Sequence, residues 1–120
     1  MKEKKPNETE VIHVKISELC EKLSLKTVCG ETDREFSGVY AGDLLSRAMS
    51  RVKFDNLWLT IMANTNVIAV ASLTEAAAVI LAEGVELLPD ALEAAQENGI
   101  TVLSSEMSVY ELCVKISEVS

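Results

Sequence analysis

The sequence is poor in aromatic residues and in histidine. Aromatic residues make up 4% of the 120 residues, and His13 is the single histidine. The core must therefore be built from aliphatic side chains, within a hydrophobic content of 48% that suits one folded domain. Because a zinc site needs several ligands close together, an isolated histidine predicts no metal site.

Cysteine is also scarce. Cys20, Cys29 and Cys113 are odd in number and do not have the spacing of metal ligands. Cys20 and Cys113 fall on apolar faces of expected helices, where a free cysteine packs as a small hydrophobic residue. We therefore expect reduced thiols, as is usual in the cytoplasm.

No apolar run is long enough to span a membrane. The longest runs cover residues 76–82 and 67–71, well below the roughly 20 residues that a bilayer requires. Residues 1–10 are charged or polar and lack the apolar core of a secretory signal, so we expect a flexible, solvated tail. These features predict a cytoplasmic protein with no membrane partner.

Negative charge is concentrated in the second half of the chain. Residues 1–53 contain ten basic and nine acidic residues, whereas residues 54–120 contain one lysine and ten acidic residues. An acidic half of this kind repels phosphate backbones, so we expect no nucleic-acid partner. A small anionic ligand would prefer the first half, near Arg34, although Arg47 and Arg51 suit a solvated helix surface.

Motifs for nucleotide binding and covalent catalysis are missing. No glycine is followed by lysine, which excludes a P-loop, and neither G-x-G-x-x-G nor G-x-S-x-G occurs. No set of residues indicates an enzyme, and no cofactor is predicted.

Apolar spacing predicts helices that alternate with strands. Helical spacing is found over residues 15–23, 44–52, 65–73, 89–98 and 109–116. Short apolar runs typical of strands cover residues 25–29, 36–40, 57–62, 76–81 and 100–103, and residues 11–14 are either a strand or a lead-in. Strands that are apolar on both faces favour a mostly parallel sheet flanked by helices, in one α/β domain over residues 11–120.

Helix ends are marked by capping residues. Asp43 is the expected N-cap of a helix, with either Thr65 or Asn66 capping the next one. Pro89 and Gly99 suit the start and the end of a later helix. A further capping box occurs at Ser108-Val109-Tyr110-Glu111, and the helix after Asp43 should bury a stripe formed by Leu44, Leu45, Ala48, Met49 and Val52.

The segment from Asp33 to Asp43 contains the strongest candidates for a binding site. Asp33 and Arg34 can fix a loop or bind a polar ligand, and Gly38 lies within a predicted strand, where it permits close approach of a backbone or ligand. A turn role for Asp33 and a surface role for Arg34 are the structural alternatives. The candidate ligand-binding residues are Asp33, Arg34, Gly38, Gly42, Asp43, Asn64, Asn66 and Glu83.

Ligands of open parallel sheets gather at the carboxyl ends of the strands. The residues expected there are Asn64, Thr65, Asn66, Glu83, Ser104 and Ser105, for which helix capping is the structural alternative. We expect Arg34, Gly38 and Asn66 to converge on one shared rim of the sheet.

Several segments resemble the DRTGG domain family over about residues 13–118. The matching segments are Leu-Ser-Leu-Lys-Thr-Val-Cys-Gly at 23–30, Asp33-Arg34 with Gly38, Gly42-Asp43-Leu44-Leu45-Ser46, Leu-Trp-Leu-Thr-Ile at 57–61, and Asn-Val-Ile-Ala-Val-Ala at 66–71. The family is similar to the N-terminal domain of HPr kinase/phosphorylase and to a middle domain of some phosphotransacetylases. The resemblance implies an accessory α/β module that forms a homodimer, with catalysis in other domains.

Two hypotheses for function are favoured. The first is a stand-alone, non-catalytic regulatory or ligand-sensing module, with a pocket between residues 33–43, 62–66 and 82–84. The alternative is a homo-oligomeric assembly or interaction subunit of a metabolic or redox complex, with no small ligand and close packing at Ala69, Ala71 and Ser72. A small enzyme using Asp33 or Asp43 is a third hypothesis, which no further residues support.

Overall fold

The computed structural model describes residues 14–119. The expected tail over residues 1–10, His13 and most of the possible strand at 11–14 lie outside the described residues. Within them, a five-stranded sheet has the order β1-β5-β4-β3-β2. The strands are β1 (Lys26–Cys29), β2 (Val39–Ala41), β3 (Leu57–Thr60), β4 (Ala78–Leu81) and β5 (Val102–Ser104).

The sheet is mostly parallel, as the sequence predicts. Strands β2, β3, β4 and β5 run in the same direction, while β1 pairs with β5 in the antiparallel direction. The parallel strands therefore define an amino edge, where each begins, and a carboxyl edge, where each ends. Since β1 runs the other way, Lys26 at its start lies beside Ser104 at the carboxyl edge.

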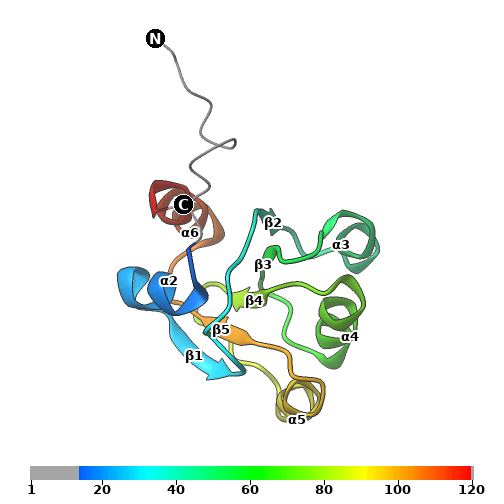
Figure 1. Cartoon of the computed structure of the whole chain (residues 1–120). Coiled ribbons are helices and arrows are strands. Elements are labelled where there is room, and N and C mark those ends of the chain that lie inside the picture. The colour runs from blue at the N-terminus through cyan, green and yellow to red at the C-terminus, as the bar shows by residue number, and fades with distance from the viewer. Residues whose placement is uncertain (1–13, 120) are drawn as a thin grey trace.

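Helices cover both faces of the sheet (Figure 1). One face carries α3, α4 and α5, and the other carries α2 and α6. The helices are α2 (Ile16–Leu23), α3 (Leu45–Arg51), α4 (Thr65–Thr74), α5 (Pro89–Glu97) and α6 (Val109–Val119). No helix among the described residues is long and apolar enough to cross a membrane.

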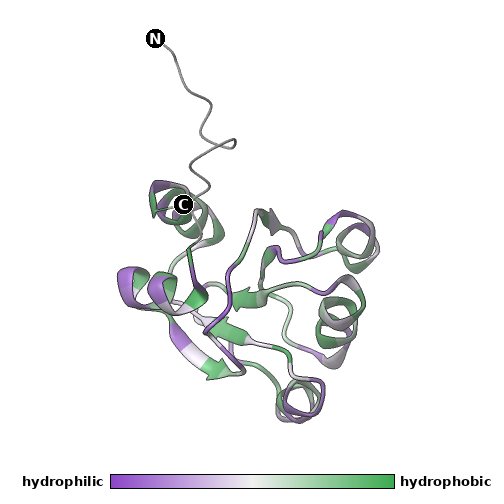
Figure 2. Cartoon of the chain, in the orientation of Figure 1, coloured by the Kyte–Doolittle hydropathy of each residue, from purple (hydrophilic) through white to green (hydrophobic). Residues whose placement is uncertain are grey.

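The core is divided into two layers because successive side chains of a strand point to opposite faces. In β3, Trp58 packs beneath α3 and α4, whereas Leu57 and Leu59 pack toward α2 and α6. All four residues of β3 and all four of β4 are buried. Figure 2 shows the resulting hydrophobic colour in the central strands β4 and β5.

Three of the predicted helix signals are confirmed. Pro89 is the first residue of α5, and Gly99 follows that helix with a φ of +66°. At the start of α6, Ser108 Oγ accepts a hydrogen bond from Glu111 N, and Glu111 Oε1 accepts one from Ser108 N.

The caps of α3 and α4 differ from the predictions. The N-cap of α4 is Asn64, whose side chain accepts hydrogen bonds from Asn66 N and Val67 N, rather than Thr65 or Asn66. Leu44 occupies the N-cap position of α3, and no side chain caps that helix. The expected apolar stripe of α3 is only partly buried, because Leu44 and Met49 are exposed.

Candidate functional site

At the amino edge, Arg34 bonds to residues that precede two different strands. Its Nε and Nη2 donate to Asp55 Oδ1 at 3.2 and 2.5 Å, and Nη2 also reaches the carbonyl oxygen of Glu75 at 3.5 Å. The backbone N–H of Asp55 donates to the same Glu75 oxygen. Arg34 therefore ties the 33–37 segment to the beginnings of β3 and β4.

Asp33 forms a second ion pair in this region. Its Oδ1 accepts from Lys15 Nζ at 2.9 Å. The hydrogen bond to Asp33, together with the charge of that carboxylate, raises the pKa of Lys15 above its ordinary value. Both side chains are largely exposed, so this pair contributes little to stability.

The sequence predicted that Gly38 lies inside a strand, but Gly38 precedes β2. It has a φ of +82°, and an added Cβ would lie 2.8 Å from Nδ2 of Asn56. The buried Asn56 side chain donates to Ser37 O and accepts from Lys53 N. The close approach predicted at Gly38 is therefore made by a side chain of the protein itself.

The predicted shared rim is wrong. Arg34 and Gly38 lie at the amino edge with Asp55 and Asn56, which precede β3. Asn66 follows β3 in the first turn of α4, at the carboxyl edge. The length of β3, a strand of four residues that spans roughly 13 Å, lies between the two edges. The error arose because the sequence does not show that the 33–38 segment returns to the start of the sheet before β2 begins.

At the carboxyl edge, Gly42 and Asp43 secure the end of β3. Asp43 Oδ1 accepts from Thr60 Oγ1 at 2.7 Å and from Ile61 N at 2.9 Å, so its carboxylate does not cap α3. The carbonyl oxygen of Gly42 accepts from Trp58 Nε1 at 2.9 Å. Both residues thus hold neighbouring backbone in place.

Asn64 and Glu83 also lie at the carboxyl edge. Asn64 caps α4, while Asn66 is exposed beside it. Glu83 N donates to Met107 O and Gly84 N donates to Ser105 O, which joins the turn after β4 to the segment after β5. Glu83 adopts a left-handed φ of +59°, as its neighbour Gly84 does at +71°.

A hollow lies beside this turn. It is an open groove of about 590 Å³, within the range of small-molecule sites. We call it the β1–β5 groove. It is lined by Ser24, Lys26, Thr27, Val28, Gly84, Val85, Glu86, Leu87, Ser104, Ser105 and Glu106.

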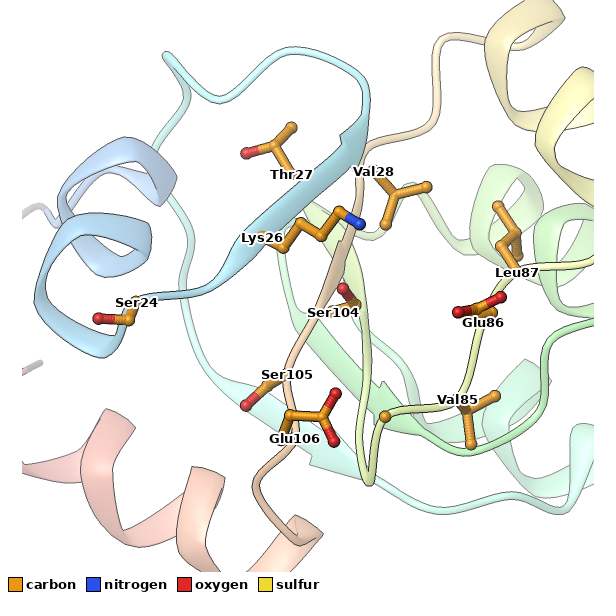
Figure 3. A pocket seen from close by; sticks show the side chains of 11 residues that line it. Ser24, Lys26, Thr27, Val28, Val85, Glu86, Leu87, Ser104, Ser105 and Glu106 are labelled. Carbon is orange, nitrogen blue, oxygen red and sulfur yellow. The ribbon is translucent and has the colours of Figure 1, made fainter.

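Two paired strands form the floor of the β1–β5 groove. Lys26 of β1 is directly opposite Ser104 of β5, so both side chains project from the same face of the sheet. Figure 3 shows the Lys26 ammonium near Ser104, with Glu86 and Leu87 on the segment across from them. Glu106 lies at the end of the groove, over Gly84.

Several polar groups of the groove have no partner within residues 14–119. No hydrogen bond or ion pair within these residues involves the Lys26 ammonium, the Glu86 carboxylate or the Ser104 hydroxyl. Ser105 Oγ, in contrast, accepts from Met107 N at 3.0 Å. One cation and two carboxylates, with hydroxyl groups and the apolar side chains of Val28 and Leu87, can bind a small molecule of mixed polarity.

Sequence reasoning found part of this groove. Ser104 and Ser105 were expected at the carboxyl edge, and Gly84 is adjacent to the predicted Glu83. Lys26 was missed because its strand was assumed to run with the others, which would have placed it at the opposite edge. The sequence of β1, Lys-Thr-Val-Cys, carries no signal for strand direction.

The other reactive side chains do not assemble into a site. Among the described residues, no group of three or more His, Cys, Asp or Glu could hold a metal ion. Cys20, Cys29 and Cys113 are free thiols and are partly buried. Burial raises the pKa of Cys20 and of Cys29, which keeps both as neutral thiols.

Comparison with known proteins finds similar folds among solved structures. No protein-family model matches the chain, and no curated protein does. The chain is similar to a crystal structure of the CBS and DRTGG domains of the regulatory region of Clostridium perfringens pyrophosphatase, complexed with the activator diadenosine tetraphosphate. The TM-score is 0.70 and the identity 16%, over 82% of this chain and 44% of that chain.

The similarity establishes a shared fold. It is consistent with the DRTGG resemblance of the sequence and confirms the α/β class with a mostly parallel sheet. The chain spans less than half the length of that structure, which itself contains only domains of the regulatory region of the pyrophosphatase.

Proposed function

We propose that this protein is a non-catalytic regulatory module that senses a small molecule in the β1–β5 groove. The observation that carries the proposal is a set of polar groups, Lys26, Ser104 and Glu86, whose side chains have no partner among residues 14–119 and surround a hollow of about 590 Å³. The groove lies at the carboxyl ends of β4 and β5, where open α/β sheets bind ligands. The regulatory role of the similar structure, which holds a nucleotide activator, supports the same class of function.

The charges of the groove restrict the ligand. Lys26 can meet one anionic group, with the free hydroxyl of Ser104 beside it. Glu86 and Glu106 accept hydrogen bonds and therefore suit hydroxyl or amino groups of the ligand. Two carboxylates in a protein of net charge −8 oppose a chain of phosphates, so we expect a ligand with a single anionic group.

A thermal-shift screen tests the proposal. Wild-type protein and Lys26→Met are screened against metabolites and nucleotides, and calorimetry is used to measure the Kd of each compound that raises the Tm. A ligand at 100 times its Kd stabilises the folded state by about 2.7 kcal/mol. We expect the Tm increase in the wild type and its loss in Lys26→Met.

Lys115→Met is the matched control, because it removes the same charge from α6, away from the groove. It should respond to the ligand as the wild type does. Equal binding by Lys26→Met would move the site out of the groove. If no compound stabilises the wild type, the sensing function is wrong.

The ligand-binding role of the eight residues chosen from the sequence stays a prediction. Arg34→Ala in the same screen tests the amino-edge group, and Asn66→Ala tests the carboxyl-edge group. Loss of binding in either variant, with the fold retained, would assign the site to that edge.

A homo-oligomeric assembly subunit is the second candidate function. It is favoured by α4, whose ten residues include no charge, and by its exposed Ala69 and Ser72, which permit close packing. We also propose a cytoplasmic location and a homodimer. A monomer at high concentration that retains ligand binding would remove this candidate and leave the sensing function intact.

A further inference from the structure

The outer surfaces of α3, α4 and α5 form a continuous layer on one side of the protein (Figure 1). Five large apolar side chains are exposed on or beside these helices, with exposed fractions of 49–68%: Leu44, Met49, Phe54, Leu73 and Leu88. We call this surface the three-helix face. Exposed apolar side chains grouped on one face indicate a protein–protein contact.

Charge divides the three-helix face into stripes. Residues 44–54, which include α3, carry exposed Arg47, Arg51 and Lys53 and no acidic residue. The ten residues of α4, which lies between its two neighbours, carry no charge. On α5 the exposed charges are Asp90, Glu93 and Glu97, with no basic residue. The order across the face is therefore positive, neutral, negative.

The neutral stripe is hollowed. A groove of about 360 Å³ runs between α4 and α5 and is lined by small side chains that include Ala69, Ser72 and Ala94. Leu73 borders this groove, and a second hollow of about 250 Å³ shares Ser72 with it and reaches Phe54. Small residues beside an exposed leucine let another helix approach closely.

A surface striped in this order is complementary to itself. When two copies face each other about a two-fold axis parallel to α4, the positive stripe of each meets the negative stripe of the other, and α4 meets α4. A two-fold axis perpendicular to α4 would instead place α3 on α3 and oppose like charges. The pattern therefore selects both the partner and the orientation.

We propose that the three-helix face is the interface of a homodimer, in which α4 packs against α4 and α3 of each protomer faces α5 of the other. The β1–β5 groove is a separate hollow. The inference rests on the homo-oligomeric candidate above and does not depend on a ligand, so a result that overturns it leaves the sensing function unaffected.

Leu73→Glu tests the neutral centre of the interface. The exposed side chain tolerates substitution in a monomer. On dimerisation, however, a carboxylate at this position would be buried and would face the same carboxylate of the second protomer. In sedimentation equilibrium of the full chain, we expect the dimer Kd to rise about 100-fold or more. Tyr110→Glu is the matched control, because Tyr110 is 77% exposed on α6, on the other side of the sheet.

Charge reversal tests the orientation. Arg47→Glu with Arg51→Glu should weaken the dimer about tenfold, and so should Glu93→Arg with Glu97→Arg. Combining all four changes restores opposite charges across the two-fold axis and should return the Kd to within about threefold of wild type. Circular dichroism shows that each variant is folded.

Three results would overturn the proposal: a wild-type monomer at millimolar concentration, a dimer unaffected by Leu73→Glu, or a dimer lost in Tyr110→Glu. Failure of the fourfold variant to recover, with each double variant weakened, would overturn the orientation of α3 against α5. Weaker dimerisation at high salt is expected for the wild type, since the charged stripes are exposed.

Discussion

The two edges of the parallel strands use their polar side chains differently. At the amino edge, Arg34 and Asn56 bond to side chains and backbone that precede β2, β3 and β4. At the carboxyl edge, Asp43 and Asn64 also bond to nearby backbone, but the side chains of Lys26, Ser104 and Glu86 surround a hollow and form no hydrogen bond or ion pair within the described residues. Side chains that are already bonded contribute to stability, while unpartnered ones remain available to a ligand.

The difference also appears in how closely the chain packs. An added Cβ on Gly30, at the amino edge, would overlap backbone of Thr101 and lie 2.9 Å from Ile100 O. At the carboxyl edge, an added Cβ on Gly84 would meet only the end of the flexible Glu106 side chain. Substitutions at the two edges should therefore have unequal effects on stability.

Gly30→Ala should have the largest effect. Its φ of +96° disfavours any Cβ, and the neighbouring backbone cannot move aside, so we expect a loss of about 3–5 kcal/mol in the free energy of unfolding. Urea denaturation measures it. Gly99→Ala is the control for backbone conformation alone, because its φ is +66° with no atom within 4 Å of the added Cβ. The control should lose about 1 kcal/mol. Equal losses in the two variants would contradict the packing difference.

Asn56→Ala should have the next largest effect. The side chain is buried, and its loss leaves Ser37 O and Lys53 N without their partners, at a cost of about 2–3 kcal/mol. Asn66→Ala, at the carboxyl edge, removes an exposed amide and should change stability by less than about 0.5 kcal/mol. A larger loss in Asn66→Ala than in Asn56→Ala would reverse the comparison.

Arg34→Ala should have a moderate effect, because Arg34 and Asp55 are 38% and 28% exposed and water screens their charges. We expect a loss of about 1 kcal/mol and a similar coupling energy in a double-mutant cycle with Asp55→Asn. Asn retains the left-handed conformation of residue 55, whose φ is +65°. A coupling energy near zero would show that the ion pair does not join the 33–37 segment to β3.

Lys26→Met should have the smallest effect on stability. The ammonium has no partner among the described residues, so the free energy of unfolding should stay within about 0.5 kcal/mol of wild type. Loss of more than about 1 kcal/mol, in chemical denaturation without ligand, would place Lys26 with the stabilising residues. The comparison between the two edges would then fail.

Much of the fold could be predicted because its signals are local. The strand at 57–62 and the helix from Pro89 to Gly99 follow from apolar runs, a proline and a glycine that act within a few residues. Asp43 shows the limit of such reasoning. Its position suited a helix cap, yet its carboxylate accepts from Thr60 and Ile61 across the sheet edge. Bonds between segments distant in sequence leave no periodic pattern.

The sequence by itself determined the order and type of the elements, the α/β class and the division into a mixed-charge half and an acidic half, because each depends on composition or on spacing along the chain. Only the tertiary structure decided that β1 runs against the other four strands, which brings Lys26 beside Ser104 and separates Arg34 from Asn66. Strand direction depends on which distant segments pair, and that choice is made by the packing of the whole core.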